Sequence, residues 1–262
     1  MTTRTRCALV TATTLFLMTA CGPGSPDPAA SGDPSRPTAS AGPITVFAAA
    51  SLSEAFTRIG TDFEARSGGP VAFSFGSSAT LATQINAGAP ADVFAAASPS
   101  TMKTVTDAGG AVAPVAFVSN TLQIAVPTGN PGQITGLSDF ADPSRTIAIC
   151  APQVPCGAAA EQVFAVAGIT PTPDTLEQDV KAALAKVAAD EVDAALVYRT
   201  DVIAAADDVE GIDFPEAGQA VNRYPIAVLA ESRAPAVAQA FVDYVLSVDG
   251  QAVLQEAGFA QP

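Results

Sequence analysis

The segment Val46-Phe-Ala-Ala-Ala-Ser51-Leu52 passes from an apolar strand pattern directly into a serine that opens a helix. The segment Phe73-Ser-Phe-Gly-Ser77-Ser78-Ala-Thr-Leu81 repeats this arrangement. Each junction aims hydroxyl groups and free backbone N–H groups at one point, and such a point suits an oxyanion. In an α/β sheet, the carboxyl ends of the strands are also where ligands bind. The two junctions therefore favour an α/β fold with an anion site.

Strand-like and helix-like patterns alternate along the chain. Helical spacing occurs in two groups of apolar residues: Leu52, Phe56, Ile59 and Phe63, and then Val237, Phe241 and Val245. Eight runs have the pattern of strands: Ile44–Ala48, Val71–Phe75, Asp92–Ala95, Val115–Val118, Leu122–Val126, Thr146–Cys150, Ala194–Tyr198 and Ile226–Ala230. This alternation predicts βαβ units around mostly parallel sheets. The runs Leu122–Pro127 and Tyr224–Ala230 could each carry the chain between two lobes.

Residues 1–20 have the pattern of a secretory signal peptide. Met1–Arg6 holds two arginines and no acid, and Cys7–Thr19 is an apolar run too short to remain as a membrane anchor. The junction Thr19-Ala20-Cys21 resembles the lipobox of bacterial lipoproteins. We therefore expect an exported protein, anchored to the outer face of the cell membrane by a lipid on Cys21. The alternative is ordinary signal cleavage beside an incidental cysteine.

Residues 21–43 are predicted to form a flexible linker. Gly22–Pro43 contains six Pro, four Gly and four Ser, and no Val, Ile, Leu or Phe. Such a segment cannot bury enough apolar surface to offset its chain entropy. The folded part is expected to begin near Ile44.

The chain is acidic, with 12 Lys and Arg, 26 Asp and Glu and no His, for a formal net charge of −14. Removal of residues 1–20 takes away Arg4 and Arg6 and no acid, so the mature chain would carry −16. Without a basic patch, it is not expected to bind nucleic acid or anionic lipid. An anion site on this chain must depend on local dipoles and hydrogen-bond donors.

Two cysteines remain in the predicted folded part. Cys150 and Cys156 lie close together in an exported chain, which favours a disulfide that closes a small loop. A metal-binding pair is the alternative, although no histidine and no third thiol accompany it.

The serine junctions also have a purely structural interpretation. Ser51 and Glu54 have the spacing of a capping box, and Ser77-Ser78 could cap a helix that begins at Ala79. Two such caps at strand ends of one α/β fold nevertheless favour a ligand site.

Three further positions have two interpretations. The segment Val154-Pro155-Cys156-Gly157-Ala158 precedes a predicted helix over 158–167, and it is either a place where backbone amides approach a ligand or a loop braced by the disulfide. Asp179 is a predicted N-cap that leaves the Val180 N–H free for a ligand or for water. Tyr198 ends a strand and is either a core residue or a hydroxyl donor.

Together these segments resemble the periplasmic molybdate-binding proteins of ABC importers, the ModA family. The resemblance covers about residues 44–260 and rests on these segments: Val46-Phe-Ala-Ala-Ala-Ser-Leu52, Phe75-Gly-Ser-Ser-Ala-Thr-Leu81 with Gln84-Ile85, Gly88-Ala-Pro-Ala-Asp-Val-Phe94, Val154-Pro-Cys-Gly157, Asp179-Val-Lys181, Val197-Tyr198 and Tyr224-Pro-Ile226. It implies a two-lobed α/β binding protein of type II with mixed, mostly parallel sheets. The ligand would lie in the cleft between lobe I, residues 44–122 and 221–262, and lobe II, residues 123–220.

The resemblance also implies the ligand contacts. Serine hydroxyls would come from Ser51 and Ser78, backbone amides from Cys156 and Val180, and a tyrosine hydroxyl from Tyr198. Many relatives have alanine where this chain has Cys156, so the predicted disulfide would touch the binding loop itself.

The function implied is capture of molybdate, and of tungstate, by a monomer that delivers the oxyanion to the membrane permease of an ABC importer. No cofactor, no metal other than that of the oxyanion and no catalytic step are expected. A sulfate binder of the same fold is the nearest alternative. Phosphate, which carries a proton near neutral pH, would want an acceptor that a donor-only site lacks. A secreted serine hydrolase is the enzyme alternative, but the chain has neither a histidine nor a Gly-x-Ser-x-Gly elbow at Ser78.

Overall fold

The structure is a computed structural model that describes residues 42–67 and 69–262. The predicted signal peptide, the predicted lipid site at Cys21 and all but the end of the predicted linker lie outside the described residues. Within the described part, no helix has the length and apolar character needed to cross a membrane.

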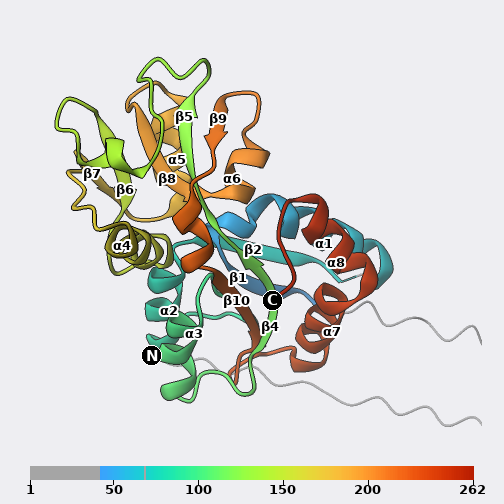
Figure 1. Ribbon diagram of the computed structural model, residues 1–262. Helices are drawn as coiled ribbons and strands as arrows, with labels where there is room; N and C mark the ends of the chain where they lie inside the picture. The colour runs from blue at the N-terminus through green and yellow to red at the C-terminus, as the bar shows by residue number, and fades with distance from the viewer. Residues whose placement is uncertain (1–41, 68) are drawn as a thin grey trace, which may run out of the picture. The chain divides into compact units, whose positions relative to one another are not determined.

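Two five-stranded mixed sheets form the frame of the described chain (Figure 1). The first sheet has the order β2-β1-β3-β10-β4 and consists of β1 (Ile44–Ala49), β2 (Val71–Gly76), β3 (Val93–Ala95), β4 (Val115–Asn120) and β10 (Asn222–Val228). The second sheet has the order β7-β6-β8-β5-β9 and consists of β5 (Leu122–Pro127), β6 (Ile147–Cys150), β7 (Thr175–Glu177), β8 (Ala194–Tyr198) and β9 (Val209–Ile212).

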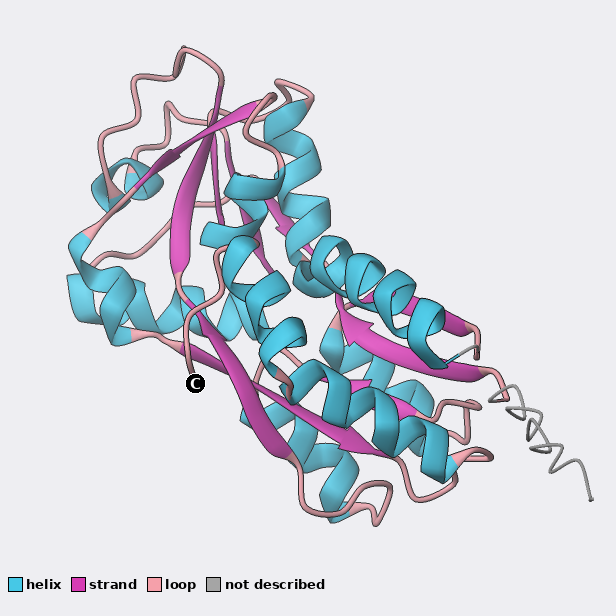
Figure 2. Cartoon of the chain, turned by 90° about the vertical axis from the view of Figure 1, so that its right-hand side faces the viewer, coloured by secondary structure: helices cyan, strands magenta, loops and turns pink. Residues whose placement is uncertain are grey.

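Helices cover both faces of the first sheet (Figure 2). One face packs against α1 (Ser53–Ser67), α7 (Pro235–Leu246) and α8 (Val248–Glu256), and the other against α2 (Ser78–Asn86) and α3 (Pro99–Asp107). Side chains alternate along β1, so Val46 and Ala48 belong to the core beneath α1 and α7, whereas Phe47 belongs to the core beneath α2 and α3. Burial on both faces explains why this strand is apolar throughout.

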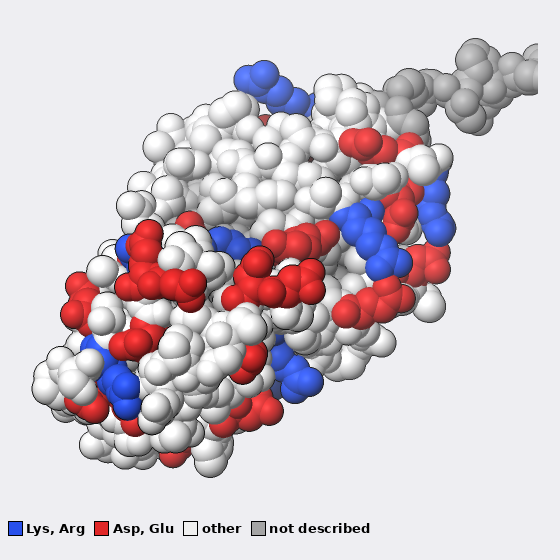
Figure 3. All heavy atoms as spheres, turned by 90° about the horizontal axis from the view of Figure 1, so that it is seen from above, with Lys and Arg blue, Asp and Glu red and all other residues white. Residues whose placement is uncertain are grey.

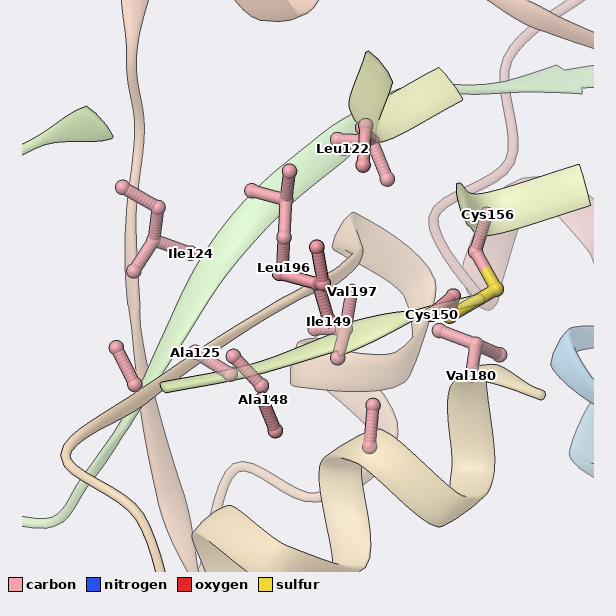
Figure 4. Close-up of a cluster of buried hydrophobic side chains, with 14 of the residues drawn as sticks. Leu122, Ile124, Ala125, Ala148, Ile149, Cys150, Cys156, Val180, Leu196 and Val197 are labelled. Atoms are coloured by element: carbon pink, nitrogen blue, oxygen red, sulfur yellow. A yellow bond between two sulfur atoms is a disulfide. The ribbon is translucent and has the colours of Figure 1, made fainter. Parts of the chain in front are cut away.

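The second sheet packs against α4 (Pro155–Ala167), α5 (Val180–Ala188) and α6 (Arg199–Ala204). One continuous apolar core joins these helices to the strands. Figure 4 shows part of this core, with the disulfide between Cys150 and Cys156 near Val180 at its edge. The predicted disulfide is therefore present, and the alternative of a metal-binding pair is wrong. No cluster of acidic, His or Cys side chains in the described residues could hold a metal ion.

The predicted α/β fold is confirmed, and all eight predicted strands are present. In each sheet three strands run parallel, β1 with β2 and β3, and β6 with β7 and β8. The strands β10 and β5 are antiparallel to their neighbours. The chain passes to the second sheet between Asn120 and Leu122 and returns between Ile212 and Asn222. Both crossings are short, and neither contains an α-helix.

Candidate oxyanion-binding site

The six parallel strands direct their carboxyl ends to one pocket. In the first sheet, residues that follow β1, β2 and β3 line the pocket. In the second sheet, residues that follow β6 and β7 line it, and so does the last residue of β8. The pocket has a cavity volume of about 20 Å³ and is lined by Ala49, Ala50, Ser51, Ser77, Ser78, Ala97, Val154, Pro155, Cys156, Asp179, Val180 and Tyr198. All five residues expected to bind the ligand line it. Pockets for drug-sized ligands are larger, at about 300–1,000 Å³, so this one suits a small ion.

Ser51 is not part of a capping box. The helix α1 begins at Ser53, after the 3-10 turn η1 (Ala50–Leu52) that contains Ser51. The Ser51 hydroxyl instead lies 2.9 Å from the Tyr224 hydroxyl, which also receives a long hydrogen bond of 3.5 Å from the Asn120 side-chain amide. Either hydroxyl can be the donor in the contact between Ser51 and Tyr224. A donation from Tyr224 would leave the Ser51 proton free for the pocket.

Ser78 is the first residue of α2, one residue earlier than the helix start predicted at Ala79. Its hydroxyl accepts a hydrogen bond of 3.0 Å from the backbone N–H of Ala97, which follows β3. An acceptor site of the hydroxyl is therefore occupied, and its proton can be donated into the pocket.

Tyr198 is fully buried, and its hydroxyl accepts a hydrogen bond of 2.7 Å from the side-chain amide of Asn222. The same Asn222 amide donates to the carbonyl of Ala97 at 2.9 Å. Burial raises the pKa of both Tyr198 and Tyr224 well above the ordinary value of 10. Both phenols therefore keep their protons and can act as donors.

Two helix N-termini supply the backbone donors. Val180 is the first residue of α5, and the Asp179 side chain caps that helix by accepting a hydrogen bond of 3.0 Å from Ala182. The predicted N-cap role of Asp179 is confirmed. The helix α4 begins at Pro155, one turn before the predicted start at Ala158, so Cys156 lies in its first turn. First-turn N–H groups have no acceptor within their own helix, and the Val180 and Cys156 amides are of this kind.

The disulfide holds the start of α4 against the end of β6. The Cα atoms of Cys150 and Cys156 are 5.7 Å apart. Gly157 follows directly, and a Cβ atom there would lie 1.9 Å from the carbonyl oxygen of Ala151. Only glycine therefore allows this close approach, which fixes the direction of the first N–H groups of α4.

The pocket is electrostatically unusual for an anion site, because its lining includes no Lys or Arg among the described residues. Asp179 lines it, although the carboxylate also caps α5. On the face shown in Figure 3, acidic side chains are spread widely with basic ones between them. Attraction for an anion must come from oriented N–H and O–H groups and from helix dipoles.

Next to the pocket lies a buried carboxylate, Asp201. It accepts a hydrogen bond of 3.2 Å from the Tyr198 backbone N–H, and its other oxygen is 3.2 Å from Lys181 Nζ. Lys181 also contacts Glu54 of the first sheet's α1 at 2.8 Å. Burial raises the pKa of Asp201 to about 6, against the opposing effect of Lys181. Burial acts to lower the pKa of Lys181, but Asp201 and Glu54 outweigh it, so Lys181 stays charged.

This pKa gives a pH-dependent contribution to stability. Because the pKa of Asp201 rises from 3.8 to about 6 on folding, its contribution is present near pH 4 and is lost as the pH rises through 6. From pH 4 to pH 7, we expect the unfolding free energy of the wild type, relative to Asp201→Asn, to fall by up to about 3 kcal/mol. Urea denaturation at several pH values measures this difference. A difference that is constant with pH would contradict the raised pKa.

Three residues that shape the site were not predicted from the sequence. Tyr224, Asn120 and Asn222 orient the hydroxyls of Ser51 and Tyr198 without lining the pocket. Tyr224 lies in one of the segments on which the family resemblance rests, but the resemblance did not predict its contact with Ser51. The two asparagines had no sequence signal, because their partners come from distant parts of the chain.

Comparison with known proteins identifies the class. Residues 44–260 match the family described as bacterial extracellular solute-binding protein, and the chain belongs to that family. Over 256 residues, which are 97% of both chains, it is 41% identical to the molybdate-binding protein ModA of Mycobacterium tuberculosis. The resemblance to the ModA family is thus confirmed.

Solved structures agree on the fold. The periplasmic molybdate-binding protein of Azotobacter vinelandii matches with a TM-score of 0.71 and 23% identity, over 84% of this chain and 99% of that one. The sulfate-binding protein SubI from Mycobacterium tuberculosis matches with a TM-score of 0.74 and 19% identity, over 84% of this chain and 86% of that one. These likenesses confirm the α/β binding-protein fold expected from the sequence.

Proposed function

We propose that this chain captures molybdate, and also tungstate, outside the cytoplasm and delivers it to the membrane permease of an ABC importer. The observation that carries the proposal is the convergence of Ser51, Ser78, Cys156, Val180 and Tyr198 on one small pocket. The names of the relatives, ModA of Mycobacterium tuberculosis among them, support the choice of oxyanion.

The chemistry of the pocket supports a fully deprotonated dianion. The Ser78 hydroxyl accepts a hydrogen bond from Ala97, and the Tyr198 hydroxyl accepts one from Asn222. Each hydroxyl can therefore donate its proton to a ligand. Molybdate, tungstate and sulfate can accept from all such donors. Burying a dianion is costly unless it is fully hydrogen-bonded, and five converging donors from two sheets meet that need.

We further propose that the protein acts at the outer face of the cell membrane and closes around its ligand. The protein would be a monomer tethered to the membrane through a lipid on Cys21. It would bind the ligand between lobe I, residues 44–122 and 221–262, and lobe II, residues 123–220. The permease would recognise the closed form. A ligand that binds the closed form more tightly shifts the chain toward it. No catalytic step and no cofactor are part of this function.

Calorimetric titration of the mature chain, made soluble by Cys21→Ser, tests the proposal. We expect tight, one-to-one binding of molybdate and tungstate and weaker binding of sulfate, with each anion recovered unchanged. Tight binding of sulfate without binding of molybdate would instead favour a sulfate binder, the second candidate, which the fold of SubI and the equal charge of the two ions keep open. Binding of none of the three anions would refute both.

A further inference from the structure

Ser77 is the one pocket-lining hydroxyl whose role is unexplained by the contacts described above. It occupies the N-cap position of α2, directly before Ser78, and is 7% exposed. Its hydroxyl oxygen is buried and makes no hydrogen bond with any described residue. A buried polar group without a partner is unfavourable, so such a group in a native fold calls for an explanation.

The usual explanation for an N-cap serine does not apply. Such a side chain normally accepts a hydrogen bond from an N–H group in the first turn of its helix. The Ser77 side chain makes no capping hydrogen bond, although its carbonyl accepts from Leu81 at 2.9 Å. The N-cap serine of α3 shows the contrast, because the Ser98 side chain accepts from the Thr101 N–H at 3.3 Å. Ser98 does not line the pocket.

We infer that Ser77 is a further ligand-binding residue, whose hydroxyl donates a hydrogen bond to an oxygen of the bound oxyanion. The inference rests on the proposed function and adds a sixth donor to the five named there. Ser77 and Ser78 would then present two adjacent hydroxyls from the N-terminus of α2, where the helix dipole also favours negative charge. The Ser77 hydroxyl, which has no partner among the described residues, would gain one when the anion binds.

The test compares Ser77→Ala and Ser77→Gly with the control Ser98→Ala, all in the soluble mature chain. Glycine is tolerated at an N-cap almost as well as serine, so Ser77→Gly removes the hydroxyl and keeps the helix start. Titration with molybdate gives the affinity, and thermal unfolding without ligand gives the stability. We expect both Ser77 variants to bind molybdate about 10- to 100-fold more weakly, with a melting temperature close to that of the wild type. Ser98→Ala should lower the melting temperature and leave the affinity unchanged.

Wild-type affinity in both Ser77 variants would overturn the inference. Loss of stability in Ser77→Ala alone, with unchanged affinity, would show that Ser77 is an ordinary helix cap and would also overturn it. These results leave the proposed function intact, because the wild type still binds. A wild-type chain that binds no molybdate, tungstate or sulfate refutes the proposed function, and the role of Ser77 with it.

Discussion

Replacing Ser51 and Ser78 together by alanine should weaken molybdate binding by about 10²- to 10⁴-fold. Each serine is expected to donate a hydrogen bond to a charged ligand, and such bonds are worth about 1.5–3 kcal/mol each. The Ser78 hydroxyl accepts from the Ala97 N–H, and the Ser51 hydroxyl contacts that of Tyr224, so each serine has a protein partner besides the ligand. Calorimetric titration of the double variant measures the effect.

The control is Arg199→Gln. Arg199 is exposed, does not line the pocket and lies next to Tyr198 in sequence. If neutral donors hold the anion, removing this nearby positive charge should change the affinity by less than a few-fold, since exposed charges are screened by water and salt. A loss as large as that of the double serine variant would mean that charge, rather than oriented donors, dominates binding.

Removing the disulfide should lower both the stability of the protein and its affinity for molybdate. For Cys150→Ala with Cys156→Ala, we expect the unfolding free energy to fall by about 2 kcal/mol, because the bridge closes only a short loop. For a folded part of this size, that corresponds to about 4–8 °C in melting temperature. Molybdate affinity should fall as well, by about tenfold, because the bridge fixes the turn that presents the Cys156 N–H.

The matched control is wild-type protein whose disulfide has been reduced. Reduced wild type and the double alanine variant should resemble each other in melting temperature and affinity, whereas the variant should not respond to a reductant. An unchanged affinity in the variant, with the expected loss of stability, would show that Gly157 and the packing of α4 orient the amide without the bridge.

Much of the fold could be predicted because its strands are short apolar runs between helices with clear periodicity. The two strands that were missed, β7 and β9, have only three and four residues, and their partly exposed sequences lack an apolar pattern. The start of α4 was placed one turn late because Pro155 resembles a loop residue, although proline is favoured in the first turn of a helix.

The site could be predicted as far as local sequence determines it. Each predicted ligand contact follows or ends a parallel strand, and the carboxyl ends of these strands meet at the pocket. The contacts are Ser51, Ser78, Cys156, Val180 and Tyr198. The orientation of their hydroxyls could not be predicted, since it depends on contacts between residues far apart in sequence. The contact between Ser51 and Tyr224 joins residues 173 positions apart, and it stands in place of the local capping box that was the structural alternative for Ser51.

Asn120 and Asn222 lie at the two points where the backbone joins the sheets. Asn120 ends β4 just before the chain leaves the first sheet, and Asn222 begins β10 just after it returns. Their side-chain amides donate to residues on the other side of the crossing, Thr200 of α6 at 2.8 Å and Tyr198 of β8 at 2.7 Å. If the two lobes of the proposed function rotate against each other, these hydrogen bonds lie where the chain crosses between them. Opening would then disturb the contacts that orient the Tyr198 hydroxyl, so lobe motion and ligand release would be coupled.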